Sequence, residues 1–315
     1  MDLSSVSHNK PKVIIDCDPG IDDAIALVVA NHFSEIIGIT TVAGNVPLEF
    51  TTVNTQSICE LLNLDVPIHS GASHAYSKQS VTAEHVHGHT GLGELLLPKP
   101  ENKIISEYAD NYLIDITKQE NDLTLIALGP LTNIAHAIEK DPAFVSRIKS
   151  ITLMGGSAYG LGNATASAEF NIFADPEAAS IVFNSGAPMK MIGLNLTRQV
   201  QMGIEHAKIL SENIGNRVSK SVSTLLYSYQ NLISSSTGNI TVPMHDPCAV
   251  LAVTHPEFFT FEKRNVIVEL DGIYTRGMTV VDERKSSPRI NCDVGYQADS
   301  ENLISLIVDA ASAKN

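Results

Sequence analysis

The sequence has no tryptophan, few aromatic residues and fewer basic than acidic side chains. Its 315 residues include 21 Lys and Arg against 35 Asp and Glu, which leaves a formal net charge of −14 at pH 7. Proteins that bind nucleic acids neutralise phosphates with clustered Lys and Arg, and anionic membrane surfaces attract the same side chains. The charge balance therefore argues against nucleic acids and membrane surfaces as partners, and favours a globular enzyme or a small-molecule binding protein.

Cysteines and long apolar runs are also scarce. The four cysteines are widely spaced and form no C-x-x-C pair, which indicates reduced thiols rather than a disulfide framework; they are Cys17, Cys59, Cys248 and Cys292. No apolar run approaches the roughly 20 residues that span a bilayer, and residues 1–12 lack the apolar centre of a signal peptide. We therefore expect a soluble, cytoplasmic protein.

Short apolar runs alternate with helical patterns along the chain. The run Lys12–Cys17 (KVIIDC) is rich in β-branched residues and suits a strand that is buried on both faces. Alternation at this spacing predicts an α/β fold with an open, mostly parallel, Rossmann-like sheet and helices on both faces. We expect a single domain over residues 1–315, because the sequence contains no linker, repeat or low-complexity tract.

The predicted elements follow this alternation. Strands are expected at 12–17, 36–42, 123–128, 148–154 and 189–194, and helices at 22–32, 47–62, 104–119, 131–139, 176–184, 215–233 and 247–254. Residues 234–241 read as a loop. An antiparallel C-terminal addition is expected at 265–270, 278–281 and 289–292, closed by a helix from Asp299.

Four carboxylates follow the first predicted strand within eight residues, at Asp16, Asp18, Asp22 and Asp23. Carboxylates this close repel one another unless a cation neutralises them, and a helix N-cap would explain only one of them. Oxygen ligands alone suit a hard cation, Ca²⁺ or Mg²⁺, rather than zinc. The segment lacks the glycine position and the terminal Glu of an EF-hand loop.

Polar groups also follow the other predicted strands. Ligands bind at the carboxyl ends of parallel strands, so these groups are expected at one edge of the sheet. The carbonyl of Leu128 points off a strand end and could bind calcium. Asn45 could equally be a turn residue. The remaining three side chains are either hydrogen-bond partners for sugar hydroxyls or solvated loop residues; they are Asn163, Glu169 and Asn171.

Histidines and tyrosines have alternative interpretations. Asp246 is either an N-cap or part of the acidic cluster, and His245 before it could transfer a proton near neutral pH. The H-x-H-x-H segment at 85–89 could bind a transition metal, but no Cys or acidic partner completes such a site, and its glycines favour a mobile loop over the active site. Tyr227 and Tyr229 face different directions on a predicted helix, so at least one packs in the core.

In their order along the chain, these segments resemble the inosine–uridine-preferring nucleoside hydrolases. Residues 16–24 (DCDPGIDDA) are similar to the family signature D-x-D-P-G-x-D-D-A. The similarity continues through Gly44-Asn45, 129–133 (GPLTN), 154–156 (MGG), Gly162-Asn163, 169–171 (EFN) and 245–247 (HDP).

The resemblance implies a Ca²⁺-dependent enzyme that hydrolyses the N-glycosidic bond of ribonucleosides (uridine, inosine and also cytidine) to free base and ribose. It implies that Ca²⁺ is bound by Asp18, Asp23, the backbone carbonyl of Leu128 and Asp246. Asp18 would also be the general base, and Asp16 would support the ligands from behind. The resemblance further implies a homodimer or homotetramer.

The same resemblance implies which residues bind the nucleoside. His245 would assist the departing base. A base-side loop would include His87, Phe170 and Tyr229. The ribose hydroxyls would be held by Asp22, Asn45, Asn163, Glu169 and Asn171.

Two other functions match parts of the pattern. A Mg²⁺-dependent phosphatase of the haloacid-dehalogenase type also has D-x-D after its first strand, but Lys or Arg usually neutralises its phosphate, and neither lies in the acidic loop here. A non-catalytic nucleoside- or ribose-binding protein would explain the sugar contacts but not a carboxylate cluster beside a histidine. Without Trp, stacking on the base falls to Tyr, Phe or His, which favours a broad or pyrimidine-leaning preference.

Overall fold

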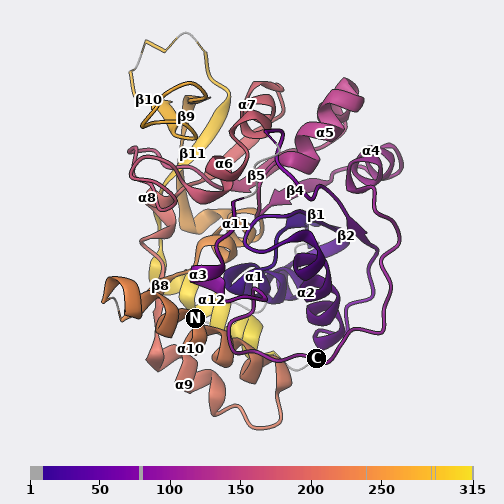
Figure 1. Ribbon diagram of the computed structural model, residues 1–315, viewed down its shortest axis with the longest axis vertical. Coiled ribbons are helices and arrows are strands. Elements are labelled where there is room, and N and C mark those ends of the chain that lie inside the picture. The colour runs from indigo at the N-terminus through magenta and orange to yellow at the C-terminus, as the bar shows by residue number, and fades with distance from the viewer. Residues whose placement is uncertain (1–9, 78–80, 239, 285, 288, 314–315) are drawn as a thin grey trace.

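The computed structural model describes residues 10–77, 81–238, 240–284, 286–287 and 289–313. Within these ranges nine strands form one sheet in the order β10-β9-β11-β6-β5-β4-β1-β2-β3 (Figure 1). The strands are β1 (Lys12–Cys17), β2 (Glu35–Thr41), β3 (Ile68–Ser70), β4 (Thr124–Ala127), β5 (Ser150–Met154), β6 (Met189–Ile192), β9 (Phe259–Val268), β10 (Thr279–Asp282) and β11 (Cys292–Ala298). A separate antiparallel pair joins β7 (Gln201–Gly203) and β8 (Thr241–Pro243).

The sheet is parallel from β3 across to β11, and only β9 and β10 run antiparallel to their neighbours. This arrangement confirms the predicted α/β fold with an antiparallel C-terminal addition. Strand β1 lies near the middle, where Asp16 is opposite Thr40 of β2 on one side and Ala127 of β4 on the other. The chain therefore leaves β1 at the carboxyl edge of the sheet, close to the ends of both neighbours.

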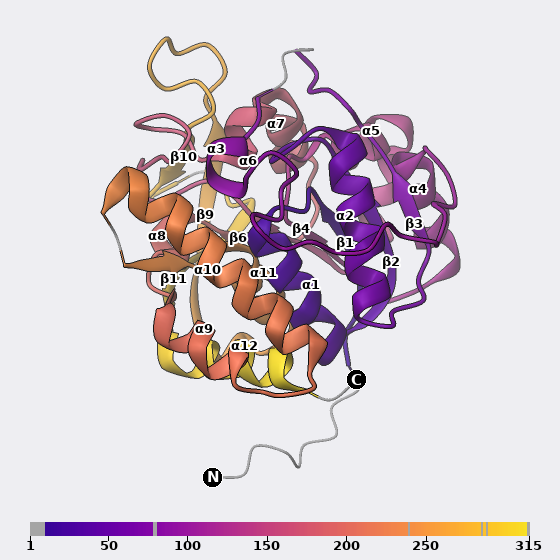
Figure 2. The same cartoon turned by 60° about the horizontal axis from the view of Figure 1, so that its bottom comes forward.

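Helices cover both faces of the sheet, as Figures 1 and 2 show. Val13 and Ile15 of β1 pack into one core, and Ile14 between them packs into the core on the other face. The helices that contribute to the first core are α1 (Ile21–Phe33), α2 (Leu48–Leu61), α9 (Ile204–Ser211), α10 (Arg217–Thr237), α11 (His245–Thr254) and α12 (Ser300–Ser312). Those that contribute to the second core are α4 (Ala109–Gln119), α5 (Thr132–Lys140) and α7 (Pro176–Asn184). Of the helices in the described ranges, none combines the length and apolar character needed to cross a bilayer.

Several predicted boundaries differ from the structure. The helix predicted at 104–119 begins only at Ala109. Helix α10 runs to Thr237, so the predicted loop at 234–241 is wrong over its first four residues. The last predicted strand, 289–292, overlaps β11 only at Cys292, because the buried residues that pack β11 lie further along the chain.

Most of the short elements were not predicted, because three to five residues are too few for a periodic pattern, and the eight-residue helix α9 was missed as well. Three of them carry residues of the candidate site described below. They are β3, β7, β8, α9, α3 (Glu84–His87), α6 (Phe170–Ala174), α8 (Leu194–Thr197) and the 3₁₀ turns at Pro142–Ser146 and Pro256–Phe258.

The packing of the second core yields a stability prediction. Phe144 is 0% exposed, and Phe144→Ala should lower the free energy of unfolding by about 3–5 kcal/mol, because it leaves a cavity in a dense core. Leu96 is 91% exposed, so Leu96→Ala should change that free energy by no more than about 0.5 kcal/mol. Urea denaturation measures both, and equal effects would contradict the assignment of the core.

Candidate active site

Three buried carboxylates lie where the chain leaves β1. Helix α1 begins at Ile21, so Asp22 and Asp23 occupy its first turn, where the helix dipole favours negative charge. The Asp23 carboxylate also accepts hydrogen bonds from the backbone N–H groups of Asp18 (3.2 Å) and Gly20 (3.0 Å). Asp23 therefore closes the turn and keeps the Asp18 side chain inside it.

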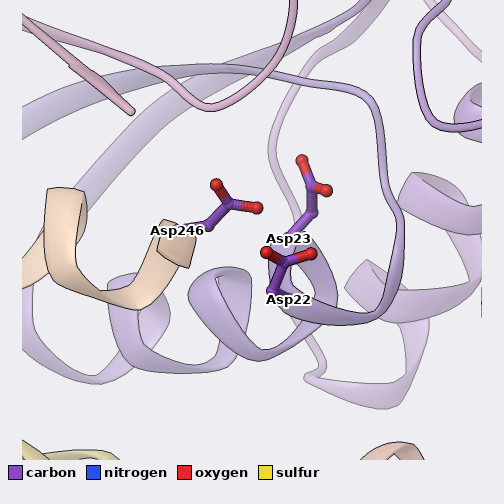
Figure 3. Close-up of side chains that lie close together, drawn as sticks. All are labelled: Asp22, Asp23 and Asp246. Atoms are coloured by element: carbon purple, nitrogen blue, oxygen red, sulfur yellow. The ribbon is translucent and has the colours of Figure 1, made fainter. Parts of the chain in front are cut away.

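A fourth carboxylate comes from the distant end of the sequence. Helix α11 begins at His245 and packs beside α1, which directs Asp246 toward Asp22 and Asp23 (Figure 3). One carboxylate oxygen from each of these three side chains lies within 4.8 Å of the others, and all three residues are buried. Among the described residues, this is the one group of three or more His, Cys, Asp or Glu side chains arranged to hold a metal ion.

Burial and mutual repulsion disfavour ionisation of these carboxyl groups. Burial, followed by the charge of Asp23, raises the pKa of Asp22 to about 8 and that of Asp18 well above its usual value. Burial and the charge of Asp22 likewise raise the pKa of Asp246. The buried Oδ1 of Asp18 has no hydrogen-bond partner within the described part of the chain. An unpartnered buried oxygen in a set of oxygen donors fits a hard divalent cation.

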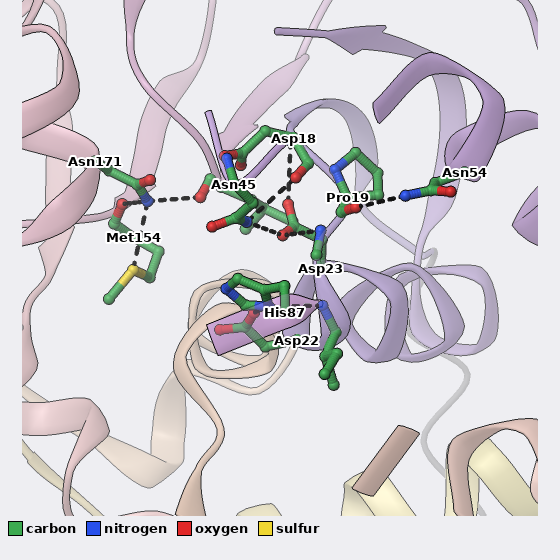
Figure 4. A network of polar contacts seen from close by, with 12 residues as sticks. Asp18, Pro19, Asp22, Asp23, Asn45, Asn54, His87, Met154 and Asn171 are labelled. Atoms are coloured by element: carbon green, nitrogen blue, oxygen red, sulfur yellow. Dashed lines mark hydrogen bonds and ion pairs between the residues drawn. The ribbon is translucent and has the colours of Figure 1, made fainter. Parts of the chain in front are cut away.

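Asn45 holds the acidic turn from the end of β2 (Figure 4). Its backbone N–H donates to Asp18 Oδ2 at 2.6 Å, and its side-chain amide donates to Asp23 Oδ2 at 3.0 Å. The preceding Gly44 is required for this approach, because a Cβ there would lie 2.0 Å from Asp18 Oδ2. Asn45 is thus a partner of the carboxylates and not only a turn residue.

Asp16 lies behind the acidic turn on β1. Its Oδ1 accepts hydrogen bonds from the Thr40 hydroxyl (2.5 Å) and from the amide of Asn133 (2.7 Å). The Asn133 amide also donates to the carbonyl of Thr41, so it joins α5 to the ends of β1 and β2. Asn133 lies in the segment 129–133 that carries part of the family resemblance, but no role was predicted for its side chain.

The opposite wall carries Glu169 and Asn171. Glu169 caps α6 and accepts hydrogen bonds from the backbone N–H groups of Gly156 (2.9 Å), Asn171 (2.9 Å) and Ile172 (3.1 Å). Burial raises the pKa of Glu169 to about 7 despite these bonds. The Asn171 amide donates to the carbonyl of Leu128 at 2.6 Å. Residues Phe170–Ala174 form helix α6, whereas the sequence analysis expects loop residues here.

A cavity of about 470 Å³ separates the two walls. Most of the site residues predicted from the sequence line it: Asp22, Asn45, His87, Leu128, Asn163, Glu169, Phe170, Asn171, Tyr229, His245 and Asp246. Three predicted residues do not line it: Asp16, Asp18 and Asp23. Of these, Asp18 and Asp23 accept hydrogen bonds from Asn45, which lines the cavity.

Two histidines approach the cavity from helices. His87 of α3 is buried, accepts the backbone N–H of Ile21 at Nδ1 (3.0 Å) and stacks on Tyr229 with 6.1 Å between ring centroids. His245 of α11 is 2.7 Å from the hydroxyl of Thr197, measured at Nδ1. Burial and, to a lesser extent, neighbouring basic groups lower the pKa of both rings to about 3, so both are neutral at pH 7.

The H-x-H-x-H segment does not converge on one point. His89 is exposed and pairs with Glu84 at 3.1 Å, whereas His85 and His87 line the cavity, His85 as an exposed side chain and His87 as a buried one. The interpretation as a transition-metal site is therefore wrong for these side chains. Tyr227 packs against the core as expected, while Tyr229 lines the cavity.

Sequence reasoning missed two residues that follow β6. Thr197 ends the short helix α8 and contacts His245, and Arg198 after it lines the cavity and donates from its guanidinium to the carbonyl of Gly162 at 2.8 Å. The rule that functional residues follow the ends of parallel strands, applied to the predicted strand at 189–194, would have found this pair.

Known proteins resemble the chain over most of its length. The family model described as inosine-uridine preferring nucleoside hydrolase matches residues 13–305. The inosine-uridine preferring nucleoside hydrolase of Crithidia fasciculata is 38% identical over 306 residues, covering 95% of this chain and 96% of that protein. The pyrimidine-specific ribonucleoside hydrolase RihA of Escherichia coli is 39% identical over 306 residues, covering 94% and 97%.

A solved structure shares the fold. The purine-preferring ribonucleoside hydrolase from Gardnerella vaginalis superposes with a TM-score of 0.90 and 33% sequence identity, covering 96% of this chain and 98% of that one. The names of these three proteins all specify a nucleoside or ribonucleoside hydrolase but differ in the preferred base.

The raised carboxyl pKa values yield a prediction for metal-dependent stability. Between about pH 6 and 8 the folded metal-free protein binds more protons than the unfolded chain, so its stability should fall as pH rises. A divalent cation bound by these carboxylates would replace those protons. The gain in Tm when Ca²⁺ is added to chelator-treated protein should therefore be larger at pH 8 than at pH 5.5.

Thermal unfolding of three proteins tests this dependence. Asp246→Asn should reduce the calcium-induced gain, whereas Asp309→Asn, on the exposed side of α12, should retain it. Gains that are absent, or equal at the two pH values, would contradict a cation site in the carboxylate cluster.

Proposed function

The chain belongs to the inosine-uridine preferring nucleoside hydrolase family, and we propose that it hydrolyses ribonucleosides, including uridine, inosine and cytidine, with Ca²⁺ in the carboxylate cluster. The products are the free base and D-ribose, as in nucleoside salvage and catabolism. One juxtaposition supports this function most directly. The same cavity is lined by buried carboxylates and amides and by two histidines with a tyrosine.

The proposed cation ligands are oxygen atoms from β1, α1, α11 and the end of β4. Asp18, Asp23, the Leu128 carbonyl and Asp246 would hold Ca²⁺. When bound, Ca²⁺ fixes a water molecule and makes it easier to deprotonate. The Leu128 carbonyl already accepts the Asn171 amide, but a carbonyl oxygen has two lone pairs and can serve both.

Asp18 is the proposed general base. Its Oδ2 is occupied by the Asn45 N–H, whereas Oδ1 has no partner among the described residues and is free to accept a proton from water. Asp22 belongs to the same cluster, but it lines the cavity and Asp18 does not. We therefore assign Asp22 to the ribose hydroxyls and Asp18 to the water.

The ribose would lie against the carboxylates and amides that line the cavity. Cleavage of a ribosyl C–N bond builds positive charge on the sugar ring, and fixed negative groups stabilise that charge. The hydroxyls would be held by Asp22, Asn45, Asn163, Glu169 and Asn171, all of which line the cavity. Asn163 is itself held by the Phe170 N–H at 2.9 Å, which leaves its amide N–H groups for the sugar.

The base would lie toward the helices. His245 would assist its departure, and His87, Phe170 and Tyr229 would surround it. More polar groups face the sugar than the base, so sugar selection should be strict and base selection looser. A group built to receive a hydroxyl discriminates against the analogue that lacks it, which predicts poor turnover of 2′-deoxynucleosides.

Incubation with uridine and inosine, followed by separation of ribose and free base, tests the activity. We expect release of both products with Ca²⁺ and loss of release after chelation, with recovery when Ca²⁺ is returned. Uridine 5′-monophosphate serves as a control, because phosphate release from it would instead indicate a phosphatase. Recovery of intact nucleoside under all conditions would contradict the proposed hydrolysis.

Replacement of the general base should affect turnover directly. Asp18→Asn should lower kcat by at least about 10²-fold, the scale of a positioned base, with steady-state ribose release as the measurement. The matched control is Asp115→Asn, an exposed residue that pairs with Lys118 at 3.0 Å and should leave kcat unchanged. Near-normal turnover by Asp18→Asn, with calcium binding confirmed by thermal shift, would remove Asp18 from this role.

A further inference from the structure

The hydrogen-bond partners of the two cavity histidines determine where their protons lie. His87 accepts the backbone N–H of Ile21 at Nδ1, at 3.0 Å. A backbone N–H can only donate, so Nδ1 of His87 carries no proton. The neutral ring therefore carries its proton on Nε2, the nitrogen that the protein leaves for a ligand in the cavity.

Thr197 imposes the same choice on His245. The Thr197 hydroxyl lies 2.7 Å from His245 Nδ1, and Thr197 is 0% exposed. Within the described part of the chain, Nδ1 is the only hydrogen-bond partner of that hydroxyl. If Nδ1 were the donor, the hydroxyl proton would be buried without an acceptor, which costs its full desolvation penalty. The hydroxyl is satisfied only when it donates to Nδ1.

We propose that Thr197 is a positioning residue that locks His245 in the tautomer whose Nε2–H faces the cavity, where it donates a hydrogen bond to the departing base. This inference rests on the proposed nucleoside hydrolysis. The C1′–N bond breaks, its electron pair moves onto the base, and the Nε2–H hydrogen bond stabilises the developing negative charge. Water forms the new C1′–O bond and gives its proton to Asp18, and the base then takes a proton from solvent.

The second cavity histidine agrees with a neutral donor at this position. His87 presents a second Nε2–H donor to the same cavity. Two fixed donors select leaving groups that carry acceptors beside the glycosidic nitrogen, as O2 of uracil and N3 of hypoxanthine do.

Substitution of Thr197 separates this role from general packing. Thr197→Val keeps the shape and removes the hydroxyl, so kcat for uridine should fall by at least about 10-fold, less than the roughly 10²–10⁴-fold of a whole positioned acid group because the His245 ring remains. A 4-nitrophenyl riboside has a leaving group stable without such a hydrogen bond and should lose far less. Thr197→Ser should retain uridine turnover. Thr55→Val, which removes another buried hydroxyl (bonded to the Thr51 carbonyl at 2.9 Å), should leave both rates unchanged.

Imidazole ¹⁵N NMR of the full chain reads the tautomer itself, with the His245 signals assigned from a His245→Gln variant. We expect the proton on Nε2 in the wild type and in Thr197→Ser, and a population with Nδ1–H in Thr197→Val. A proton on Nδ1 in the wild type would overturn the proposal, and so would equal rate losses on both substrates with an unchanged tautomer.

The two proposals can fail separately. If Thr197→Val does not fold, the wild-type and Thr197→Ser spectra still decide the tautomer. A wild-type protein that releases no ribose would refute the proposed function, whereas an Nδ1–H tautomer in an active enzyme would refute only the role of Thr197.

Discussion

Repulsion among buried carboxylates is the constraint around which the rest of the site is arranged. Six acidic side chains are buried at one edge of the sheet: Asp16, Asp18, Asp22, Asp23, Glu169 and Asp246. Backbone N–H groups, the α1 N-terminus and the amides of Asn45 and Asn133 offset part of that repulsion. Burial and mutual repulsion still hold the pKa values of Asp18, Asp22 and Asp246 above their usual range, and a divalent cation in the cluster would offset the remaining repulsion.

The central part of the sheet can be predicted well from the sequence, because its strands must be apolar on both faces. Lys12–Cys17 has this character, and its alternate side chains do enter different cores. The rule that ligands bind after parallel strands then brings Asp22 and Asn45 to one edge. Periodicity fails for α3 and α6, since four or five residues do not complete a pattern.

Partners that are far apart in sequence could not be predicted from the residues alone. The contact between Asp22 and Asp246 depends on α11 packing beside α1, and the one between Thr197 and His245 depends on the position of a four-residue helix. The roles of Glu169 as a helix cap and of Asn45 as a carboxylate partner are likewise tertiary. The family resemblance implied roles for Glu169 and Asn45, but not the hydrogen bonds that hold their side chains in place.

The two halves of the cavity differ in how they are anchored. The carboxylates and amides proposed for the sugar follow β1 and β2 or cap α6, so a change in them disturbs the sheet edge or the acidic turn. The groups proposed for the base come from α3, α6, α10 and α11, and Tyr229 lies on a long helix that packs over one face (Figure 2). Such helices can exchange a side chain without moving a strand. Base preference can therefore vary while ribose recognition and the carboxylate cluster stay constant.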